Sequence, residues 1–243
     1  AFVHDIGRGA IAANGIGITL KPNQIAARMN FCTQENGVIV DRRAGRIPTN
    51  ACAELADLLN AKVQIPGVKV SVHAVMDYRA VVIFEGDNLS IDVADTDPGK
   101  TGSPAKPVKA TSPEGEATAA IVAKFVEQAK SVLSDRKQAN MVVLRGFAIQ
   151  PDFAPMQECY KLKPACIATY PDYKGVAKMI GMDILETGKE IADEFTTLEE
   201  RWNDYDFFFL HVKKTDSLGE DGDFNGRVHK IEETDKEIPR LVA

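Results

Sequence analysis

The chain has 243 residues, of which 44% are hydrophobic and 26% are charged, a composition typical of a globular protein with one large or two medium domains. This composition excludes disordered, collagen-like and mucin-like proteins. The formal net charge of −6 provides no overall field that would attract nucleic acid or an anionic membrane, so an anionic ligand requires a local cluster of positive side chains.

The four cysteines lie at wide spacings without a C-x-x-C motif, which predicts free buried thiols in a reducing cytoplasm. The longest apolar runs are far shorter than the roughly 20 residues that a membrane span needs. The chain has no initiator methionine and begins within a patterned segment, so we expect a fragment of a longer protein.

The first part of the chain predicts a mixture of short strands and helices. Residues 26–41 are expected to form two strands around a turn at residues 35–37, and the proline- and glycine-rich residues 97–113 are expected to form a loop. The other elements expected here are a helix at residues 50–59, strands at residues 68–75 and 80–84, and a helix that begins after Ser112 and ends at Ser134.

From Met141 onward, apolar runs without alternation are interspersed with helical patterns. The expected strands are residues 141–144, 165–169, 182–185 and 206–212, and the expected helices are residues 173–180, 191–202 and 224–241. Such runs indicate a sheet that is covered on both faces. We therefore predict an α/β fold in which residues 1–38 and 140–243 form a mainly parallel core, with residues 39–139 inserted as a smaller αβ lid domain.

Three segments match known binding loops. The G-x-G-x-x-A match at residues 7–12 is followed by helix-interrupting glycines, and the relaxed phosphate-loop match at residues 94–101 is followed by a proline-rich loop, so neither predicts nucleotide binding. Residues 221–232 match the calcium-loop pattern in full, although a strand is expected where an entering helix is needed. A non-catalytic calcium-binding protein is therefore kept as an alternative.

Arginines are concentrated in a few places. The string DRRAGR at residues 41–46 places three guanidiniums within five residues, and Arg145 closes an apolar strand just before a glycine. Planar, forked donors suit carboxylate and phosphate oxygens, so these residues predict an anion site. Salt bridges with the many acidic residues are the alternative.

Carboxylates gather directly after the apolar strand at residues 206–212, in the string KKTDSLGEDGD at residues 213–223. Several oxygens in this turn can face one divalent ion, whereas a solvated acidic turn is the competing explanation. His211, within the strand, is expected to belong to the core.

Five segments in this order resemble one known family. They are ARMNFCT at residues 27–33, DRRAGRI at 41–47, DTDP at 95–98, LRG at 144–146, and the acidic string that begins with Thr215 and Asp216. Together they resemble the archaeal-type 2,3-bisphosphoglycerate-independent phosphoglycerate mutases of the alkaline phosphatase superfamily. The resemblance extends over nearly the whole chain and implies a core of alkaline-phosphatase-like type.

The resemblance implies an isomerase of glycolysis and gluconeogenesis that interconverts 3-phosphoglycerate and 2-phosphoglycerate through a phosphoserine intermediate. It implies two divalent metal ions, manganese or magnesium, no 2,3-bisphosphoglycerate cofactor, a cytoplasmic location, and a small-molecule substrate rather than nucleic acid or membrane. The oligomeric state is left open. Another metal-dependent phosphoester transferase or hydrolase on the same fold is the alternative.

The resemblance also assigns roles to individual residues. The metal ligands implied are Asp216 and Glu220, the latter standing where many members have histidine. The family's nucleophilic serine is expected upstream of this chain, so the fragment alone is expected to be inactive. The substrate-site candidates are Arg28, Arg42, Arg43, Arg46, Arg145 and Lys174.

Overall fold

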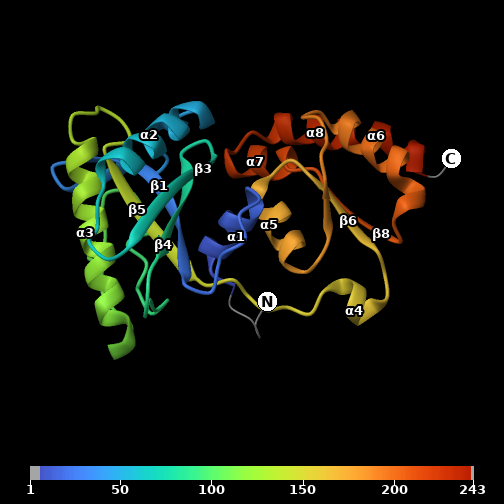
Figure 1. Ribbon diagram of the computed structural model, residues 1–243. Coiled ribbons are helices and arrows are strands. Elements are labelled where there is room, and N and C mark those ends of the chain that lie inside the picture. The colour runs from blue at the N-terminus through green and yellow to red at the C-terminus, as the bar shows by residue number, and fades with distance from the viewer. Residues whose placement is uncertain (1–5, 242–243) are drawn as a thin grey trace. The chain divides into compact units, whose positions relative to one another are not determined.

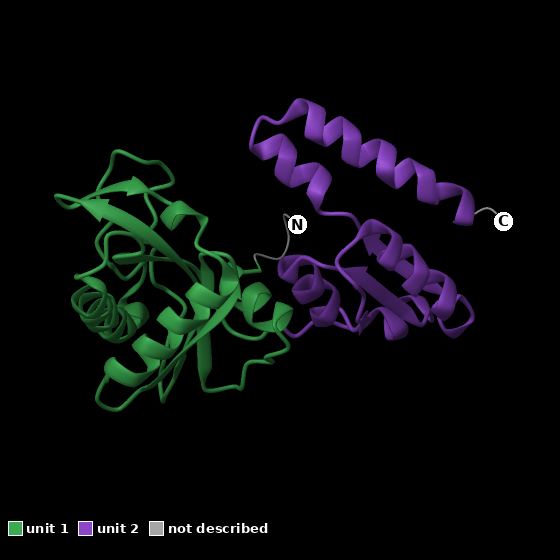
Figure 2. Cartoon of the chain, turned by 90° about the horizontal axis from the view of Figure 1, so that it is seen from above, with its two compact units in different colours: residues 1–151 green, residues 152–243 purple. Residues whose placement is uncertain are grey.

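The computed structural model describes residues 6–241 and divides into two compact units, residues 1–151 and 152–243 (Figure 2). This division differs from the predicted one, since β1 (Gln24–Glu35) and β5 (Met141–Ala148) lie in one sheet with the strands between them in sequence. The assignment of residues 39–139 to a lid stays a prediction.

The first unit is built on a five-stranded sheet. In it β1 pairs with β2 (Val38–Asp41), β4 (Arg79–Glu85) and β5, while β3 (Lys69–Met76) pairs with β4. Every one of these pairings is antiparallel, so the prediction of a mainly parallel sheet is wrong for this unit, whereas a mixed α/β fold is confirmed. The apolar run of β5 suggested a parallel strand, but it arises because both faces of this strand are buried, which says nothing of strand direction.

Helices cover the sheet of the first unit on both faces. The helices α2 (Thr49–Lys62) and α3 (Glu116–Leu133) pack on one face, where Phe84 meets Phe125 edge-on at 5.5 Å between ring centroids. The short helix α1 (Arg8–Gly15) lies against the other face (Figure 1). It approaches β1 so closely that a Cβ atom at Gly9 would lie 2.0 Å from the carbonyl oxygen of Ala26.

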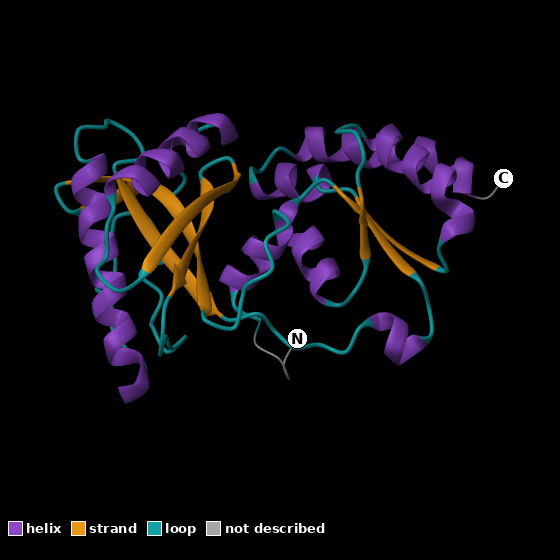
Figure 3. Ribbon diagram, viewed as in Figure 1, coloured by secondary structure: helices purple, strands orange, loops and turns teal. Residues whose placement is uncertain are grey.

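The second unit contains a small parallel sheet. Its strand order is β7 (Asp183–Leu185), β6 (Pro164–Ala168) and β8 (Phe207–His211), with both pairings parallel. Side chains of α5 (Pro171–Met179) pack on one face of β6, and those of α6 (Ile191–Arg201) pack on the other. This is the alternation of strands and helices that the apolar runs after Met141 predicted, and here the parallel direction is confirmed (Figure 3).

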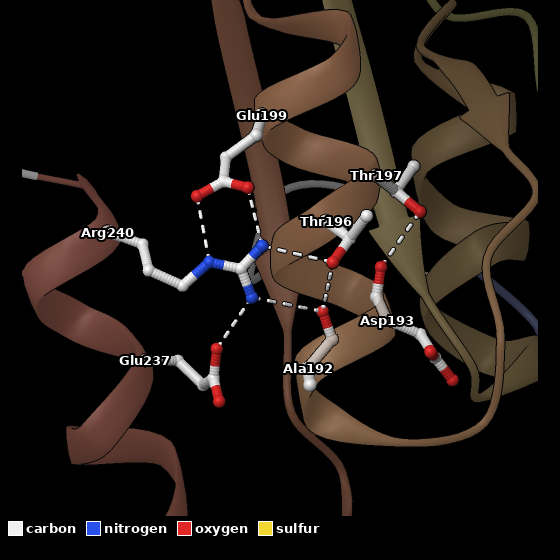
Figure 4. A network of polar contacts seen from close by, with 7 residues as sticks. All are labelled: Ala192, Asp193, Thr196, Thr197, Glu199, Glu237 and Arg240. Atoms are coloured by element: carbon white, nitrogen blue, oxygen red, sulfur yellow. Dashed lines mark hydrogen bonds and ion pairs between the residues drawn. The ribbon is translucent and has the colours of Figure 1, made fainter.

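Two helices and a short 3-10 segment complete the second unit: α7 (Lys214–Glu220), α8 (Phe224–Glu237) and η4 (Ile238–Leu241). Arg240 of η4 donates to Glu199 and Thr196 of α6 and to Glu237 of α8, with N–O distances of 2.8 Å from Nε to Glu199 Oε1 and 2.7 Å from Nη1 to Glu237 Oε2 (Figure 4). One guanidinium thus fastens the end of the chain's described part to α6.

Glu194 of α6 is a buried carboxyl group at 3% exposure. Burial raises the pKa of Glu194 to about 7, despite a hydrogen bond from the Thr169 side chain, and its Oε2 atom has no hydrogen-bond partner. This buried carboxyl group was not predictable from sequence, because a glutamate in an amphipathic helix ordinarily lies on the solvated face.

The remaining short elements are η1 (Ala44–Arg46), η2 (Pro113–Gly115), α4 (Met156–Tyr160) and η3 (Trp202–Asp204). Residues 97–113 form the predicted loop, with only isolated bridges to neighbouring segments. The helix α7 was not predicted, since its residues were expected to form an acidic turn. It has seven residues, about two turns of helix, despite Gly219.

Candidate functional site

The turn that carries the DRRAGR string has an unusual backbone. Ala44, Gly45 and Arg46 all have positive φ angles, of 49°, 64° and 53°, although only one of them is glycine. Asp41 supports this turn, because its carboxylate accepts the backbone N–H groups of Arg43 at 2.7 Å and Gly45 at 2.5 Å. Left-handed backbone at non-glycine residues costs about 1 kcal/mol each, and such positions cluster at functional sites.

A second segment, residues 95–97, lies along β5 and is fixed to it by hydrogen bonds. The Thr96 hydroxyl accepts the N–H of Leu144 at 2.8 Å, and the N–H of Thr96 donates to the Leu144 carbonyl at 2.9 Å. The Asp95 carboxylate accepts the N–H of Gly146 at 2.7 Å. The DTDP motif therefore lies beside the β5 residues that lead into Arg145.

These two segments bring Arg42 and Arg145 to one carboxylate. Arg42 binds Asp97 in a two-pronged pair, with Nε 3.1 Å from Oδ1 and Nη2 2.8 Å from Oδ2. Arg145 approaches the same group, with Nη1 3.6 Å from Asp97 Oδ2, and its Nε lies 3.8 Å from Asp95 Oδ2. Arg28 faces Arg145 across the β1–β5 pairing, so both side chains belong to one face of the sheet.

Asp97 is ionised despite its burial. Removal from water would raise the pKa of its carboxyl, but the hydrogen bonds from Arg42 and from the Gly99 N–H, with the charges of Arg42 and Arg145, hold the pKa below its usual 3.8. The same pair raises the pKa of Arg42. The arrangement has a buried negative charge behind two partly exposed guanidiniums, which can bind an anion on their outer side.

Among the predicted substrate residues, the structure brings Arg42 and Arg145 to Asp97 and sets Arg28 opposite Arg145 in the β1–β5 pairing. Arg43 and Arg46 extend from the same turn as Arg42 and are exposed. Lys174 belongs to the second unit, where its Nζ lies 3.7 Å from Glu186 Oε2. The sequence did not identify Asp97 as a site residue, although the DTDP motif that contains it was one of the resembling segments.

The predicted metal ligands lie on the exposed helix α7, one turn apart. Asp216 pairs with Lys213, and Glu220 ends the helix. Hard carboxylate oxygens suit magnesium or manganese, yet no group of three or more His, Cys, Asp or Glu side chains in residues 6–241 is arranged to hold a metal. The donor chemistry of the two carboxylates therefore suits such an ion, but two side chains alone do not complete a coordination shell.

The calcium loop expected at residues 221–232 as an alternative is not formed. Helix α8 begins at Phe224, so the ligand positions from Asn225 onward are helical and cannot wrap around an ion. Asp223 instead caps this helix, its Oδ1 accepting the Gly226 N–H at 2.9 Å. His211 stacks on Tyr173 with 3.6 Å between ring centroids, in keeping with the packing role expected for it.

The second unit also has an apolar hollow of about 760 Å³. Among the described residues, the negatively charged Asp206 is the one charged residue that lines this hollow, so the hollow does not suit a phosphate ester. Its lining comprises Phe195, Leu198, Trp202, Tyr205, Asp206, Phe207, Phe208, Leu210, Val212, Thr234, Ile238 and Leu241. No helix in the described part of the chain is long and apolar enough to cross a membrane.

Comparison with known proteins gives a consistent result. A family model described as 2,3-bisphosphoglycerate-independent phosphoglycerate mutase matches residues 2–139. Proteins named as probable 2,3-bisphosphoglycerate-independent phosphoglycerate mutases are 43% identical in Thermotoga sp. and 44% identical in Deinococcus radiodurans, over 99% and 98% of this chain. The chain spans 60% of the length of each of these relatives.

Two solved structures resemble the chain. A cofactor-independent phosphoglycerate mutase from Thermoplasma acidophilum has 27% identity and a TM-score of 0.63, covering 98% of this chain and 66% of its own. A protein from Pyrococcus horikoshii has a TM-score of 0.73 at 23% identity, covering 97% of this chain and 59% of its own, and supports the fold alone.

Proposed function

Because the chain belongs to the family of 2,3-bisphosphoglycerate-independent phosphoglycerate mutases, we propose that it serves the interconversion of 3-phosphoglycerate and 2-phosphoglycerate. The observation that carries the proposal is the meeting of Arg42 and Arg145 at Asp97 of the DTDP segment, with Arg28 opposite Arg145 in the β1–β5 pairing. The substrate carries a phosphate and a carboxylate, and guanidiniums bind both groups through paired N–H donors.

In this proposal the arginines hold the glycerate while the phosphoryl group moves between its two neighbouring hydroxyl groups. Such a transfer requires a fixed orientation of the acceptor hydroxyl and exclusion of water, which would otherwise take the phosphoryl group. Arg43 and Arg46, on the same turn as Arg42, are proposed to contact the substrate as well. Lys174 is proposed to lie near the phosphate in the complete enzyme.

Asp216 and Glu220 are proposed to contribute carboxylate ligands to a divalent metal site, with magnesium or manganese as the ion. A bound ion of this kind would stabilise charge on the transferred phosphoryl oxygens. Glu220 favours a hard ion over zinc, because a carboxylate replaces the softer imidazole ligand. The Lys213 partner of Asp216 would have to be displaced by the ion.

The wider assignment follows from the same family. We propose that the parallel sheet of the second unit belongs to an alkaline-phosphatase-like core, and that residues 39–139 act as a lid over it. The protein is proposed to work in glycolysis and gluconeogenesis in the cytoplasm, with phosphoglycerate as its partner rather than nucleic acid or membrane. The buried thiols Cys32, Cys52 and Cys166 suit a reducing compartment.

The test is conversion of 3-phosphoglycerate to 2-phosphoglycerate by the complete gene product, with and without manganese. Arg42→Ala is expected to lower kcat/KM by at least about a hundredfold, since a charged group of the substrate loses its paired donors. Arg136→Ala, which removes an exposed arginine of the same unit, is the matched control. Release of inorganic phosphate without isomerisation would contradict the proposal and favour a hydrolase on the same fold.

A further inference from the structure

Asp97 occupies an unusual position for an acidic residue beside an anion site. Its side chain is 2% exposed, whereas the side chains of Arg42 and Arg145 that it contacts are 29% and 32% exposed. The carboxylate therefore lies behind the two guanidiniums and cannot itself be reached by a large ligand. Its contacts with them act from the protein side, leaving their outer sides toward solvent.

The position of Asp97 is fixed independently of the arginines. Its Oδ1 accepts the N–H of Gly99 at 2.8 Å, and the preceding residue, Thr96, is 1% exposed and bonded to Leu144 through both its hydroxyl and its backbone. The N–H of Lys106 donates to the Thr96 carbonyl at 2.8 Å. A carboxylate held by the loop and by β5 can orient a mobile side chain that binds it.

Arg42 is oriented by this contact in a specific way. Two of its five N–H donors bind the two oxygens of Asp97, which fixes the plane of the guanidinium and directs the remaining donors away from the carboxylate. Arg145 lies within ion-pair distance of the same oxygen that Arg42 Nη2 binds. The shared negative charge also offsets the repulsion between the two cations.

We propose that Asp97 is a positioning residue that holds Arg42 and Arg145 together as one anion-binding fork. The inference deepens the proposed function and rests on it, since the anion is taken to be phosphoglycerate. Asp97 does not touch the substrate, and it acts by fixing the guanidiniums before the ligand arrives. Pre-orientation of this kind lowers the entropic cost of binding.

The proposal differs from simple electrostatics in the sign of its expected effect. Removing a buried negative charge beside an anion site strengthens the local positive field, so charge alone predicts tighter anion binding in Asp97→Asn. Positioning predicts weaker binding, because the amide nitrogen of asparagine cannot accept a guanidinium N–H and the two-pronged pair is lost. Asp97→Glu keeps the charge but moves it by one methylene, and positioning again predicts weaker binding.

The experiment is a titration of the complete gene product with 3-phosphoglycerate, followed by NMR. Asp97→Asn and Asp97→Glu are each expected to weaken binding by about tenfold, the loss typical of a hydrogen bond between charged groups. Asp57→Asn, an exposed substitution on α2 that changes the net charge equally, is the matched control and is expected to bind as the unaltered chain does. Backbone amide signals of residues 6–151 report whether each variant is folded.

A second measurement needs no variant at Asp97. The Nε–H of Arg42 donates to Asp97 Oδ1, so its exchange with water is expected to be slower than that of exposed Arg136 in the unaltered chain. Equal exchange rates would overturn the inference, and so would unchanged or tighter binding in a folded Asp97→Asn chain. If the unaltered complete protein does not bind 3-phosphoglycerate while Arg42 exchange is slow, the substrate assignment fails, whereas the orientation of Arg42 by Asp97 stands.

Discussion

The buried carboxyl of Glu194 makes the stability of the second unit depend on pH. In the folded chain its pKa is raised by burial to about 7, compared with 4.5 for the ordinary group. A raised pKa means that folding favours the protonated form. The protonated Glu194 carboxyl therefore contributes fully to the free energy of unfolding below pH 4.5, and this contribution is lost as the pH rises through 7.

The size of this loss follows from the two pKa values. Each tenfold change in the proton equilibrium is worth about 1.4 kcal/mol, so a rise from 4.5 to about 7 corresponds to about 3 kcal/mol. Replacement of Glu194 by glutamine removes the titration while nearly preserving the shape of the side chain. Relative to the unaltered chain, the free energy of unfolding of Glu194→Gln is expected to rise by about 3 kcal/mol between pH 4.5 and pH 8. For a domain of this size each kcal/mol corresponds to roughly 4–8 °C in Tm.

The assay is urea denaturation at several pH values, followed by tryptophan fluorescence. The chain has one tryptophan, Trp202, which lies in the second unit and stacks on Phe208 at 5.9 Å between ring centroids, so its emission reports that unit. Glu200→Gln, an exposed substitution on the same helix, is the control and is expected to show little pH-dependent gain. A Glu194→Gln difference that stays constant from pH 4.5 to pH 8 would refute the reasoning.

Two further predictions concern packing. With a thiol reagent at pH 8, the native chain is expected to show one fast-reacting cysteine, the exposed Cys159, because burial raises the pKa of Cys32 and Cys52 to about 12 and that of Cys166 to about 11. In denaturant all four cysteines are expected to react. A second fast-reacting thiol in the native chain would contradict the burial. Gly9→Ala is expected to destabilise the first unit by about 3 kcal/mol, since the new methyl group would overlap the Ala26 carbonyl, and amide hydrogen exchange of β1 measures the loss; unchanged protection would show that α1 can move away.

Local elements were predictable from sequence because their signals are local. The segment after Ser112 has a serine at the N-cap position, a proline at the start and a continuous apolar stripe, and the structure forms η2 and α3 there, although the Ser112 hydroxyl donates to Asp92 rather than capping the helix. Sheet direction was not predictable in the same way. Antiparallel strands buried on both faces carry the same unbroken apolar runs as parallel ones, so the direction of β5 was predicted wrongly while that of β6 was not.

The candidate site was predictable in its residue types but not in its grouping. The spacing of the arginines indicated an anion site, and the family resemblance indicated which arginines belong to it. Only the pairing of β1 with β5, however, sets Arg28 opposite Arg145. The partner carboxylate, Asp97, is reached through a loop without a periodic pattern. The calcium pattern at residues 221–232 failed for the opposite reason, since Asp223 serves as a helix cap and the rest of the pattern continues as helix.

The long strand β1 has a consequence for how the chain is made. It pairs with β5, whose residues are synthesised more than a hundred positions later, as in the pairing of Ala26 with Ala148. At typical rates of translation, this leaves one edge of an apolar strand without its neighbour for on the order of ten seconds. During that interval the open edge of β1 is a natural target for chaperones, and a chain that ends before Met141 would leave β1 paired with β4 but without β5.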